Sequence, residues 1–485
     1  MSTVIVAGSG PDSLTAAILL AKAGNEVHVL EEGAQLGGLL WGASEFSPGY
    51  RTPGLHLDMR VDHDLIRKLC PGQDLSVLRS VLPIDTPDGA VPGGLSEPSE
   101  LPGWMAYREW LLSVQQGLRT VARRPAPPFA GEGSLWPLLR VGATLRWMGK
   151  GALREVLRRG PLSLQDALGE WPELGDGVRA SLALTALSGT WLGPRDPTTN
   201  GLGLLRAAVA DEVARDSASL LELLSKQAAA SGATLHFNQR LSSISLKDGR
   251  VDGVVAGGMR RACDALLMGG SEDLLSLLPP FSTPSSVEHS WKHVRRRGNV
   301  AVVRLGLETP LERDGVVLQR IHTAGHVDQL ERAHDAVKYG QLAEVTPLDV
   351  RQWSSCIAGL APEGHHVLGI HVHGVPFDPE LAKEDVMQKV GAALDSVAPG
   401  ISERVVCSHV LRPCDLESEV GLRGGHLWGA EMALDQLWAT RPFAAIARYK
   451  TPWRGLYAAG CSYHPGSLAH GSGGAHAARI MLGSL

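Results

Sequence analysis

Two glycines near the start of the chain have the spacing of a phosphate-binding turn. Gly8 and Gly10 follow a β-branched run from Thr3 to Ala7, and good helix formers follow them from Leu14 to Ala21. In such a strand-turn-helix unit the backbone can approach a pyrophosphate, whose charge is stabilised by the positive end of the helix. Ser13 stands where a third glycine usually lets helix and strand pack closely. Since the glycine pair alone is common in turns, its context decides the interpretation.

An acidic residue follows the next predicted strand. Residues Glu26 to Leu30 form that strand, and Glu31 comes directly after it. An acid about twenty residues after the glycines binds the ribose hydroxyls of an adenosine. Glu32 is a second candidate, for which a solvated loop charge is the alternative. The doublet Gly37-Gly38 follows, as in FAD-binding proteins of the glutathione-reductase type, and favours FAD over NAD.

Two further motifs leave alternatives open. Gly54, in the loop from Pro48 to His56, could let backbone reach a flavin ring, although a surface loop fits the spacing equally well. His371 and His373 share one face of a predicted strand, with no carboxylate or cysteine beside them. A polar sheet face is therefore predicted there, and no metal site.

Composition limits the class of protein. With 485 residues the chain exceeds the size of a single core, so two lobes are expected. A hydrophobic content of 44% and a net charge of -5 describe a globular protein with no basic field to attract nucleic acid. The six cysteines are scattered, as in a reducing compartment. The apolar stretch from Val4 to Ala23 is broken by glycines and lacks a basic flank, so a cytoplasmic location is expected.

The order of predicted elements indicates a discontinuous domain. Strands are predicted at 234–237, 241–246, 251–255 and 265–270, and the patterns at 299–305 and 366–373 suggest an antiparallel sheet in a second lobe. We predict an α/β fold with a Rossmann-like FAD-binding domain of the glutathione-reductase type and a mixed α+β substrate domain. The FAD-binding segments would be 1–85, 216–275 and 411–485, with a helical substrate part at 86–215 and a substrate sheet at 276–410. A second nucleotide-binding unit, and thus a dedicated NAD domain, is not predicted.

A basic amphipathic helix is predicted from Leu135 to Arg159. Its apolar residues recur three or four apart, and six Lys and Arg residues accompany a single acid, Glu155. With Trp136 and Trp147 it could lie on an anionic membrane surface. Packing on the core with a solvated basic face is the favoured alternative.

The sequence resembles a known family most clearly near its C-terminal end. The run from Gly424 to Pro442, which contains L-D-Q-L-x-x-x-R-P, and the later Gly455 to Gly460 are similar to phytoene-desaturase-like FAD oxidoreductases. The resemblance is greatest to the branch of pyridine nucleotide-disulphide oxidoreductase domain protein 2. It covers nearly the whole chain and is sharpest at 1–58 and 415–485.

The resemblance implies an FAD-dependent dehydrogenase or desaturase. Such an enzyme removes two hydrogens from a lipophilic small molecule, such as a lipid, a terpenoid or a secondary metabolite, and passes the electrons to oxygen or a quinone. One alternative is a flavin amine oxidase of the same fold, although Lys292 does not fit the lysine that those enzymes often place near the flavin. Another is a flavin-free binding protein of the Rab escort or GDP-dissociation-inhibitor kind.

The resemblance also implies cofactor contacts at both ends of the chain. We expect the ADP half of FAD to lie at Gly8, Gly10, Pro11, Asp12, Ser13, Glu31, Glu32, Gly37, Gly38 and Leu39. We expect the pyrophosphate and flavin end at Gly54, Leu55, Gly460, Pro465, Gly466, Ser467, Leu468, Gly471 and Gly474. A helix predicted from about Ser472 would direct its positive end at the flavin.

The chain departs from the family pattern in two places. His470 stands where relatives have an apolar residue beside the expected flavin, and residues 215–219 replace a glycine-rich segment. A histidine can take the proton that accompanies hydride loss near pH 7, so His470 is the first candidate base. Its alternative role is a hydrogen bond to a flavin carbonyl. His426 and His56 are further candidates for the base.

Overall fold

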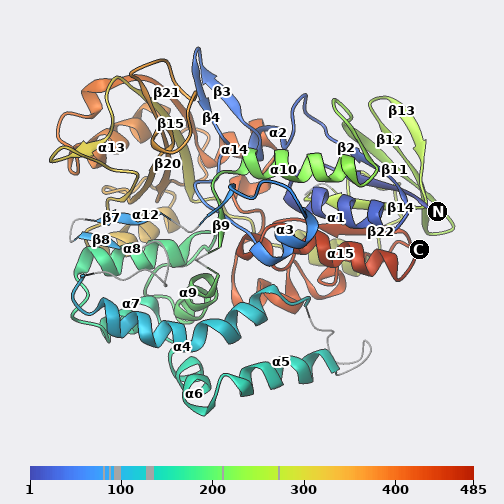
Figure 1. The fold of residues 1–485 in the computed structure, drawn as a ribbon, viewed down its shortest axis with the longest axis horizontal. Helices are drawn as coiled ribbons and strands as arrows, with labels where there is room; N and C mark the ends of the chain where they lie inside the picture. Colours follow the sequence, from blue (N-terminus) through green and yellow to red (C-terminus); the bar gives the residue numbers. More distant parts are fainter. Residues whose placement is uncertain (80–81, 87–88, 92–99, 127–135, 210–211, 271–273) are drawn as a thin grey trace.

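Two sheets and a group of helices organise the chain. The computed structural model describes residues 1–485 apart from 80–81, 87–88, 92–99, 127–135, 210–211 and 271–273. Figure 1 shows one sheet near both termini, a second sheet in the opposite lobe, the helices α4, α7, α8 and α9 below that second sheet, and α5 and α6 below α4. Among the described helices, none is both long and apolar enough to cross a membrane.

The sheet near the termini is parallel and is assembled from distant parts of the chain. Its strand order is β10-β2-β1-β14-β22, and every neighbouring pair is parallel. The strands are β1 (Thr3–Ala7), β2 (Glu26–Leu30), β10 (Ala233–His236), β14 (Ala265–Gly269) and β22 (Leu456–Ala459). Helix α1 (Pro11–Lys22) packs between α10 (Ser217–Ala230) and α15 (Ser472–Leu482). This arrangement confirms the predicted α/β fold with a Rossmann-like domain.

An antiparallel three-stranded sheet is inserted between β10 and β14. It consists of β11 (Leu241–Lys247), β12 (Arg250–Ala256) and β13 (Met259–Ala262). The hairpin of β11 and β12 lies where the sequence predicts it. Strand β13 was not predicted, because its residues M-R-R-A are largely exposed and have no apolar alternation.

The second lobe contains a seven-stranded sheet. Its order is β21-β15-β20-β19-β18-β7-β8, and only the β18 and β7 pair is parallel. The strands are β7 (Ile84–Thr86), β8 (Gly89–Val91), β15 (Val300–Leu307), β18 (Arg320–His322), β19 (Leu348–Gln352), β20 (His366–His373) and β21 (Val405–Leu411). All eight residues of β15 are buried, which explains its apolar sequence, and Arg304 is the one charged residue in it.

The remaining elements connect and cover these sheets. The helices are α2 (Gly38–Trp41), α3 (His63–Leu69), α4 (Trp104–Arg123), α5 (Trp136–Trp147), α6 (Lys150–Arg159), α7 (Leu164–Gly169), α8 (Asp176–Leu187), α9 (Thr199–Ala208), α11 (Ser285–Lys292), α12 (Val327–Lys338), α13 (Lys383–Asp395) and α14 (Pro413–Val420). The short strands are β3 (Ser44–Ser47), β4 (Tyr50–Thr52), β5 (Met59–Arg60), β6 (Leu78–Arg79), β9 (Val213–Ala214), β16 (Glu312–Arg313) and β17 (Val316–Val317).

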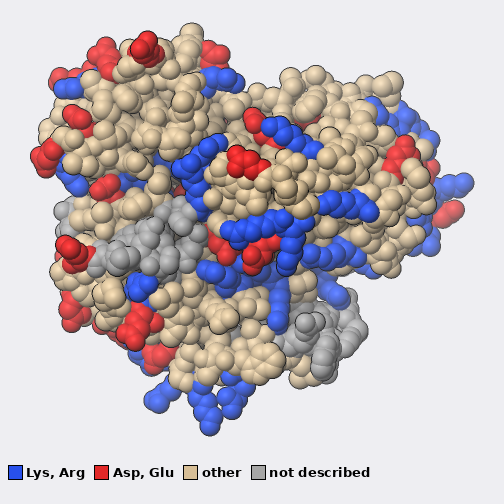
Figure 2. All heavy atoms as spheres, in the orientation of Figure 1, with Lys and Arg blue, Asp and Glu red and all other residues tan. Residues whose placement is uncertain are grey.

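The predicted single helix from Leu135 to Arg159 is wrong. The structure has two helices there, α5 and α6, because Gly149 between them has a φ of 90°. Leu135 itself lies outside the described residues. Two basic residues of α6 form ion pairs within the chain, since Arg158 and Arg159 pair with Glu170 at 2.8 and 2.9 Å. Figure 2 shows Lys and Arg side chains projecting at the end of the molecule where α6 lies.

Candidate functional site

The predicted phosphate-binding turn lies where α1 and α15 begin. Gly8 has a φ of 83° and Gly471, directly before α15, has a φ of 87°, a left-handed conformation that favours glycine. A Cβ at Gly474 would lie 1.8 Å from the carbonyl oxygen of Asp12, so only glycine lets the two helices approach this closely. Two helix N-termini are thereby brought together, and such ends attract anions.

Ser13 takes the place of the third glycine without loosening the fold. The side chain is fully buried, and its Oγ would lie 1.7 Å from a Cβ placed at Gly269. The glycine that allows close packing of helix and sheet therefore stands at the end of β14, not on α1. This exchange explains how the turn keeps its shape despite the departure from the usual motif.

Glu31 joins the first turn to the glycine doublet. One carboxylate oxygen accepts from the backbone N–H and the hydroxyl of Ser9 at 2.9 and 2.5 Å, and the other accepts from Gly33 N–H at 2.9 Å. The Ser9 hydroxyl in turn accepts from Gly37 N–H at 2.7 Å. Glu31 is thus buried at the ends of β1 and β2, where a ribose-binding acid is expected.

The neighbouring predicted residues differ in their surroundings. Glu32 is exposed and pairs with Arg240 at 3.2 Å, which matches its alternative as a surface charge. Gly37 has a φ of 77° and packs so tightly that a Cβ would lie 2.3 Å from Leu221. Leu39 lies within α2, and its side chain is outside the described part of the structure.

The three candidate bases are brought together in one buried cluster of rings. Trp41 stacks on His56 with ring centroids 4.5 Å apart, and it meets His470 edge-on at 5.0 Å. Trp428 lies 6.2 Å from His56 and 6.1 Å from His426. The Trp41 indole also lies 3.4 Å from the position of a Cβ at Gly10, so the cluster adjoins the glycine turn. Trp41 was missed in the sequence, although an aromatic three residues after the glycine doublet was the available signal.

Burial keeps the candidate bases neutral. It lowers the pKa of His470 to about 3, and the nearby Arg60 and Arg206 guanidiniums lower it further. Burial also lowers the pKa of His426 to about 4 and holds that of His56 well below its usual value. A neutral imidazole can accept a proton, and a negative charge placed beside it would raise its pKa.

The loop around Gly54 is fixed by protein contacts. A Cβ at Gly54 would lie 2.2 Å from Ser217 Oγ, and that hydroxyl donates to the carbonyl of Pro53 at 2.7 Å. His371 Nε2 donates to the carbonyl of Leu55 at 2.9 Å. His371 is therefore buried against this loop, and its register partner on β19 is the buried Asp349, so this part of the sheet face is polar but enclosed. The 215–219 segment supports the loop and caps α10 through Asp216.

The C-terminal glycine stretch forms a tight turn held by one arginine. Gly460 has a φ of 117°, and a Cβ there would lie 2.7 Å from Gly270 Cα. Gly466 has a φ of 61°, and Pro465 precedes it. Arg441, from the family motif, is fully buried and donates to the carbonyls of Ala430, Glu431 and Cys461 at 2.8, 2.8 and 2.6 Å. The R-P of the motif thus supports the turn.

A largely apolar cavity adjoins the ring cluster. Its walls come mainly from α4, α7, α8 and α9, with Trp104, Leu111 and Leu204 among the apolar residues. Arg60, from β5, also lines it, and the backbone carbonyl of Arg60 accepts from His470 N–H at 2.8 Å. Ser467, one of the expected cofactor residues, contacts Arg206 of the same cavity at 3.3 Å, whereas Leu468 is packed in the core.

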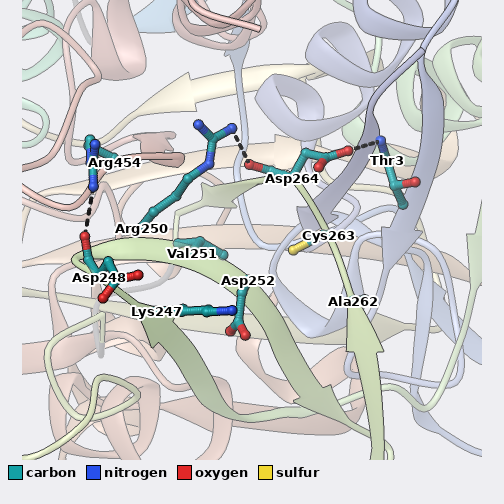
Figure 3. A pocket seen from close by; sticks show the side chains of 10 residues that line it. All are labelled: Thr3, Lys247, Asp248, Arg250, Val251, Asp252, Ala262, Cys263, Asp264 and Arg454. Atoms are coloured by element: carbon teal, nitrogen blue, oxygen red, sulfur yellow. Dashed lines mark hydrogen bonds between the residues drawn. The ribbon is translucent and has the colours of Figure 1, made fainter.

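A second, open hollow has a different character. It lies beside β12 and β1, and charged side chains line it together with Val251, Ala262 and Cys263 (Figure 3). Arg454 donates to the Asp248 carbonyl at 2.7 Å, and Thr3 N–H donates to Asp264 at 2.8 Å. None of the residues that line it is an expected cofactor residue. Within the described part of the chain, no group of three or more metal-ligating side chains is found.

Asp12 gives a testable dependence on pH. Burial raises its pKa to about 6, although hydrogen bonds from Gly474, Gly471 and Gly473 oppose the shift. Because the folded state binds this proton more tightly than the unfolded state, the stabilising contribution is complete below about pH 4 and is lost as the pH rises through about 6. Asp12→Asn, which keeps an acceptor for Gly474, should therefore raise the melting temperature more at about pH 8 than at about pH 5. Equal gains at both pH values, measured by thermal unfolding, would argue against a buried, protonated Asp12.

Comparison with known proteins agrees with this geometry. Residues 6–59 match the model of the NAD(P)-binding Rossmann-like domain. The chain is 27% identical over 388 residues to pyridine nucleotide-disulfide oxidoreductase domain-containing protein 2 of Rattus norvegicus, covering 73% of this chain and 65% of that protein. Putrescine oxidase bound to putrescine matches with a TM-score of 0.60 and 16% identity, over 99% of both chains. Cyclohexylamine oxidase of Brevibacterium oxydans matches with a TM-score of 0.56 and 13% identity, also over 99% of both.

The fold is therefore that of putrescine oxidase and cyclohexylamine oxidase, with a Rossmann-like domain at residues 6–59. In sequence the chain is similar to pyridine nucleotide-disulfide oxidoreductase domain-containing protein 2, and it spans 65% of the length of the rat protein. The resemblance to that branch, stated from the sequence, is thereby confirmed, and the relatives and structural neighbours are oxidoreductases.

Proposed function

We propose that the chain is an FAD-dependent dehydrogenase or desaturase that removes two hydrogens from a lipophilic small molecule. The observation that carries the proposal is that the buried histidines lie between the glycine turn, to which Glu31 is bonded, and one largely apolar cavity. Bound FAD would supply the hydride acceptor, and oxygen or a quinone would reoxidise it. The test is whether the purified chain carries the visible absorbance of oxidised flavin, and whether a substrate bleaches it without oxygen.

The polar groups at the junction of α1 and α15 suit a bound dinucleotide. The hydroxyls of Thr15 and Ser472 are buried there and have no partner among the described residues. Both ring nitrogens of His56 are likewise unpartnered within the described structure. Since buried polar atoms normally form hydrogen bonds, these atoms favour a ligand at this place. Any group bound at Gly10 would also meet the Trp41 indole.

Different residues of the chain would bind the cofactor, bind the substrate and accept the proton. Glu31 would accept from the ribose hydroxyls, and the N-termini of α1 and α15 would bind the anionic parts of the cofactor. The cavity walls would bind the apolar substrate and exclude water from it. His470, whose Nδ1 lies 3.7 Å from Cys461 Sγ, would accept the proton that the substrate loses.

Replacing His470 should slow catalysis without emptying the cofactor site. We expect His470→Ala to retain FAD. With any substrate that reduces the flavin of the parent protein, the variant should reduce its flavin about a hundredfold more slowly. Stopped-flow absorbance under anaerobic conditions measures this rate, and flavin content is the control. An unchanged rate of flavin reduction would remove His470 from the mechanism.

Amine oxidation is the second candidate function. The similarity in fold to putrescine oxidase and cyclohexylamine oxidase favours it. Lys292 gives it no support, because this residue is exposed on α11 and pairs with Glu288 at 2.8 Å. A panel of amines and of non-amine lipophiles, with mass analysis of the product, separates the two functions. Loss of two hydrogens from a C–C bond supports the first, and an imine or aldehyde product supports the second.

We also propose that α5 and α6 contact an anionic membrane surface. Trp147 is 85% exposed and Leu157 is 68% exposed, and both stand among basic residues. The side chain of Trp136 is outside the described structure. Exposed apolar side chains beside Lys and Arg suit an interface of anionic lipid.

This proposal predicts a selective loss of vesicle binding. The double variant Trp147→Ser, Leu157→Ser should cosediment several-fold less with vesicles of phosphatidylglycerol and phosphatidylcholine than the parent chain. Phe281→Ser, which removes a fully exposed aromatic outside α5 and α6, is the control and should bind like the parent. If the parent itself does not bind anionic vesicles, or the double variant binds as well, α5 and α6 do not contact membrane.

A further inference from the structure

A buried arginine in the apolar cavity lacks a counterion. Arg206 is 1% exposed in the middle of α9, and its Nη2 contacts only Met432 Sδ at 3.4 Å and Ser467 Oγ at 3.3 Å. Its Nε and Nη1 have no hydrogen-bond partner among the described residues. Burying an unpaired charge is costly, so a guanidinium at such a place normally faces an anion.

A second arginine of the same cavity, Arg60, also lacks a paired carboxylate among the described residues. Arg60 is 7% exposed, and none of the ion pairs among the described residues includes its guanidinium. The nearest acids are already used, because Asp58 and Asp349 both pair with Arg320. Asp58 also pairs with Arg351, whose Nη1 lies 3.7 Å from Asp58 Oδ1. Among the described residues that line the cavity, Arg320 is therefore paired with carboxylates, whereas the guanidiniums of Arg60 and Arg206 are not.

The electrostatic effect on neighbouring groups is consistent with this excess of positive charge. Burial holds the pKa of Arg206 well below its usual range, and the Arg60 and Arg441 guanidiniums depress it further. The two cavity arginines, Arg60 and Arg206, also depress the pKa of His470. A ligand with a negative charge between Arg60 and Arg206 would relieve both effects.

We propose that the cavity binds an amphipathic carboxylate, with its carboxylate between Arg60 and Arg206 and its apolar part against α4 and α9. The proposal rests on the proposed function, because it names the substrate class of that site. The planar fork of a guanidinium matches a carboxylate, whereas Trp104, Leu111 and Leu204 offer only apolar contact. Because Arg60 is bonded to His470 through its backbone, the carboxylate end of the substrate lies nearest the candidate base.

Three probes of equal chain length test the proposal. Octanoate, octanol and octylamine are titrated into the protein purified with FAD, and binding is measured by calorimetry. We expect octanoate to bind at least about tenfold more tightly than octanol, and octylamine to bind most weakly. Arg206→Met and Arg60→Met should each abolish the preference for octanoate and leave octanol binding nearly unchanged. Arg206→Lys, which keeps the charge, should retain part of the preference.

The control variant is Arg304→Met. Arg304 is also a buried arginine, 5% exposed on β15, but it does not line this cavity. Its replacement should leave the preference for octanoate intact. Equal affinity for octanoate and octanol, tightest binding of octylamine, or a preference that survives in both Arg206→Met and Arg206→Lys would overturn the proposal.

Flavin content separates this inference from the proposed function. If the protein carries FAD but shows no preference for octanoate, the carboxylate site is wrong and the flavoenzyme remains. If the protein takes up no FAD and octanoate binding still depends on Arg206, the cavity binds carboxylates but the proposed redox function fails.

Discussion

Glu31→Gln lowers the affinity of the chain for FAD by at least about tenfold, and up to about a hundredfold. The carboxylate can accept charge-assisted hydrogen bonds from ribose hydroxyls, which a neutral amide forms more weakly. The amide would also turn an N–H toward a donor, since both oxygens of Glu31 already accept, from Ser9 on one side and Gly33 on the other. Fluorescence titration of the apoprotein with FAD measures the change.

The adjacent acid provides a matched control for this prediction. Glu32→Gln removes the same charge one residue away, but Glu32 is exposed and contacts only Arg240 among the described residues. We expect its FAD affinity to stay within about twofold of the parent, because an exposed ion pair contributes little. Equal losses in both variants would indicate a general charge effect, and no loss in Glu31→Gln would contradict the ribose role.

Gly474→Ala destabilises the fold by about 3 kcal/mol, because the new methyl group would overlap the backbone of Asp12. The Cβ would lie 1.8 Å from a carbonyl oxygen, and neither helix can relax without separating α1 from α15. The gain in helix propensity from glycine to alanine, about 1 kcal/mol, is too small to compensate. Urea unfolding measures the loss, and FAD affinity should fall with it, since both helix N-termini move.

A glycine at the other end of α15 is the control. A Cβ at Gly483 would meet only backbone oxygens at 3.7 and 3.8 Å, which is ordinary contact. Gly483→Ala should therefore change the free energy of unfolding by no more than about 0.5 kcal/mol. If Gly474→Ala is equally mild, the two helices are not in the close contact described here.

Features that depend on a short stretch of sequence could be predicted. Strand β1, the glycine turn and strand β2 follow from local patterns of β-branched residues, glycines and an acid within about thirty residues. Ser472 was also predicted correctly as the start of the last helix, because Gly471 precedes it and an alanine-rich stretch begins at Ala475. The parallel sheet then follows from the alternation of strands and helices.

Features that depend on contacts between distant segments could not be predicted from the sequence. The exchange of the third glycine between Ser13 and Gly269 needs two parts of the chain to be seen in contact. The same is true of Arg60 and Arg206, which come from β5 and α9 and meet only in the fold. An arginine in the apolar sequence of α9 was the one available signal. The break between α5 and α6 was missed because the apolar spacing continues across Gly149.

The most direct test of the account is the binding of FAD itself. Apoprotein is titrated with FAD, and bound flavin is counted by its visible absorbance after the free cofactor is removed. The account predicts one FAD per chain, with affinity reduced in Glu31→Gln and retained in Glu32→Gln. A well-folded chain that stays colourless and binds no FAD would contradict it.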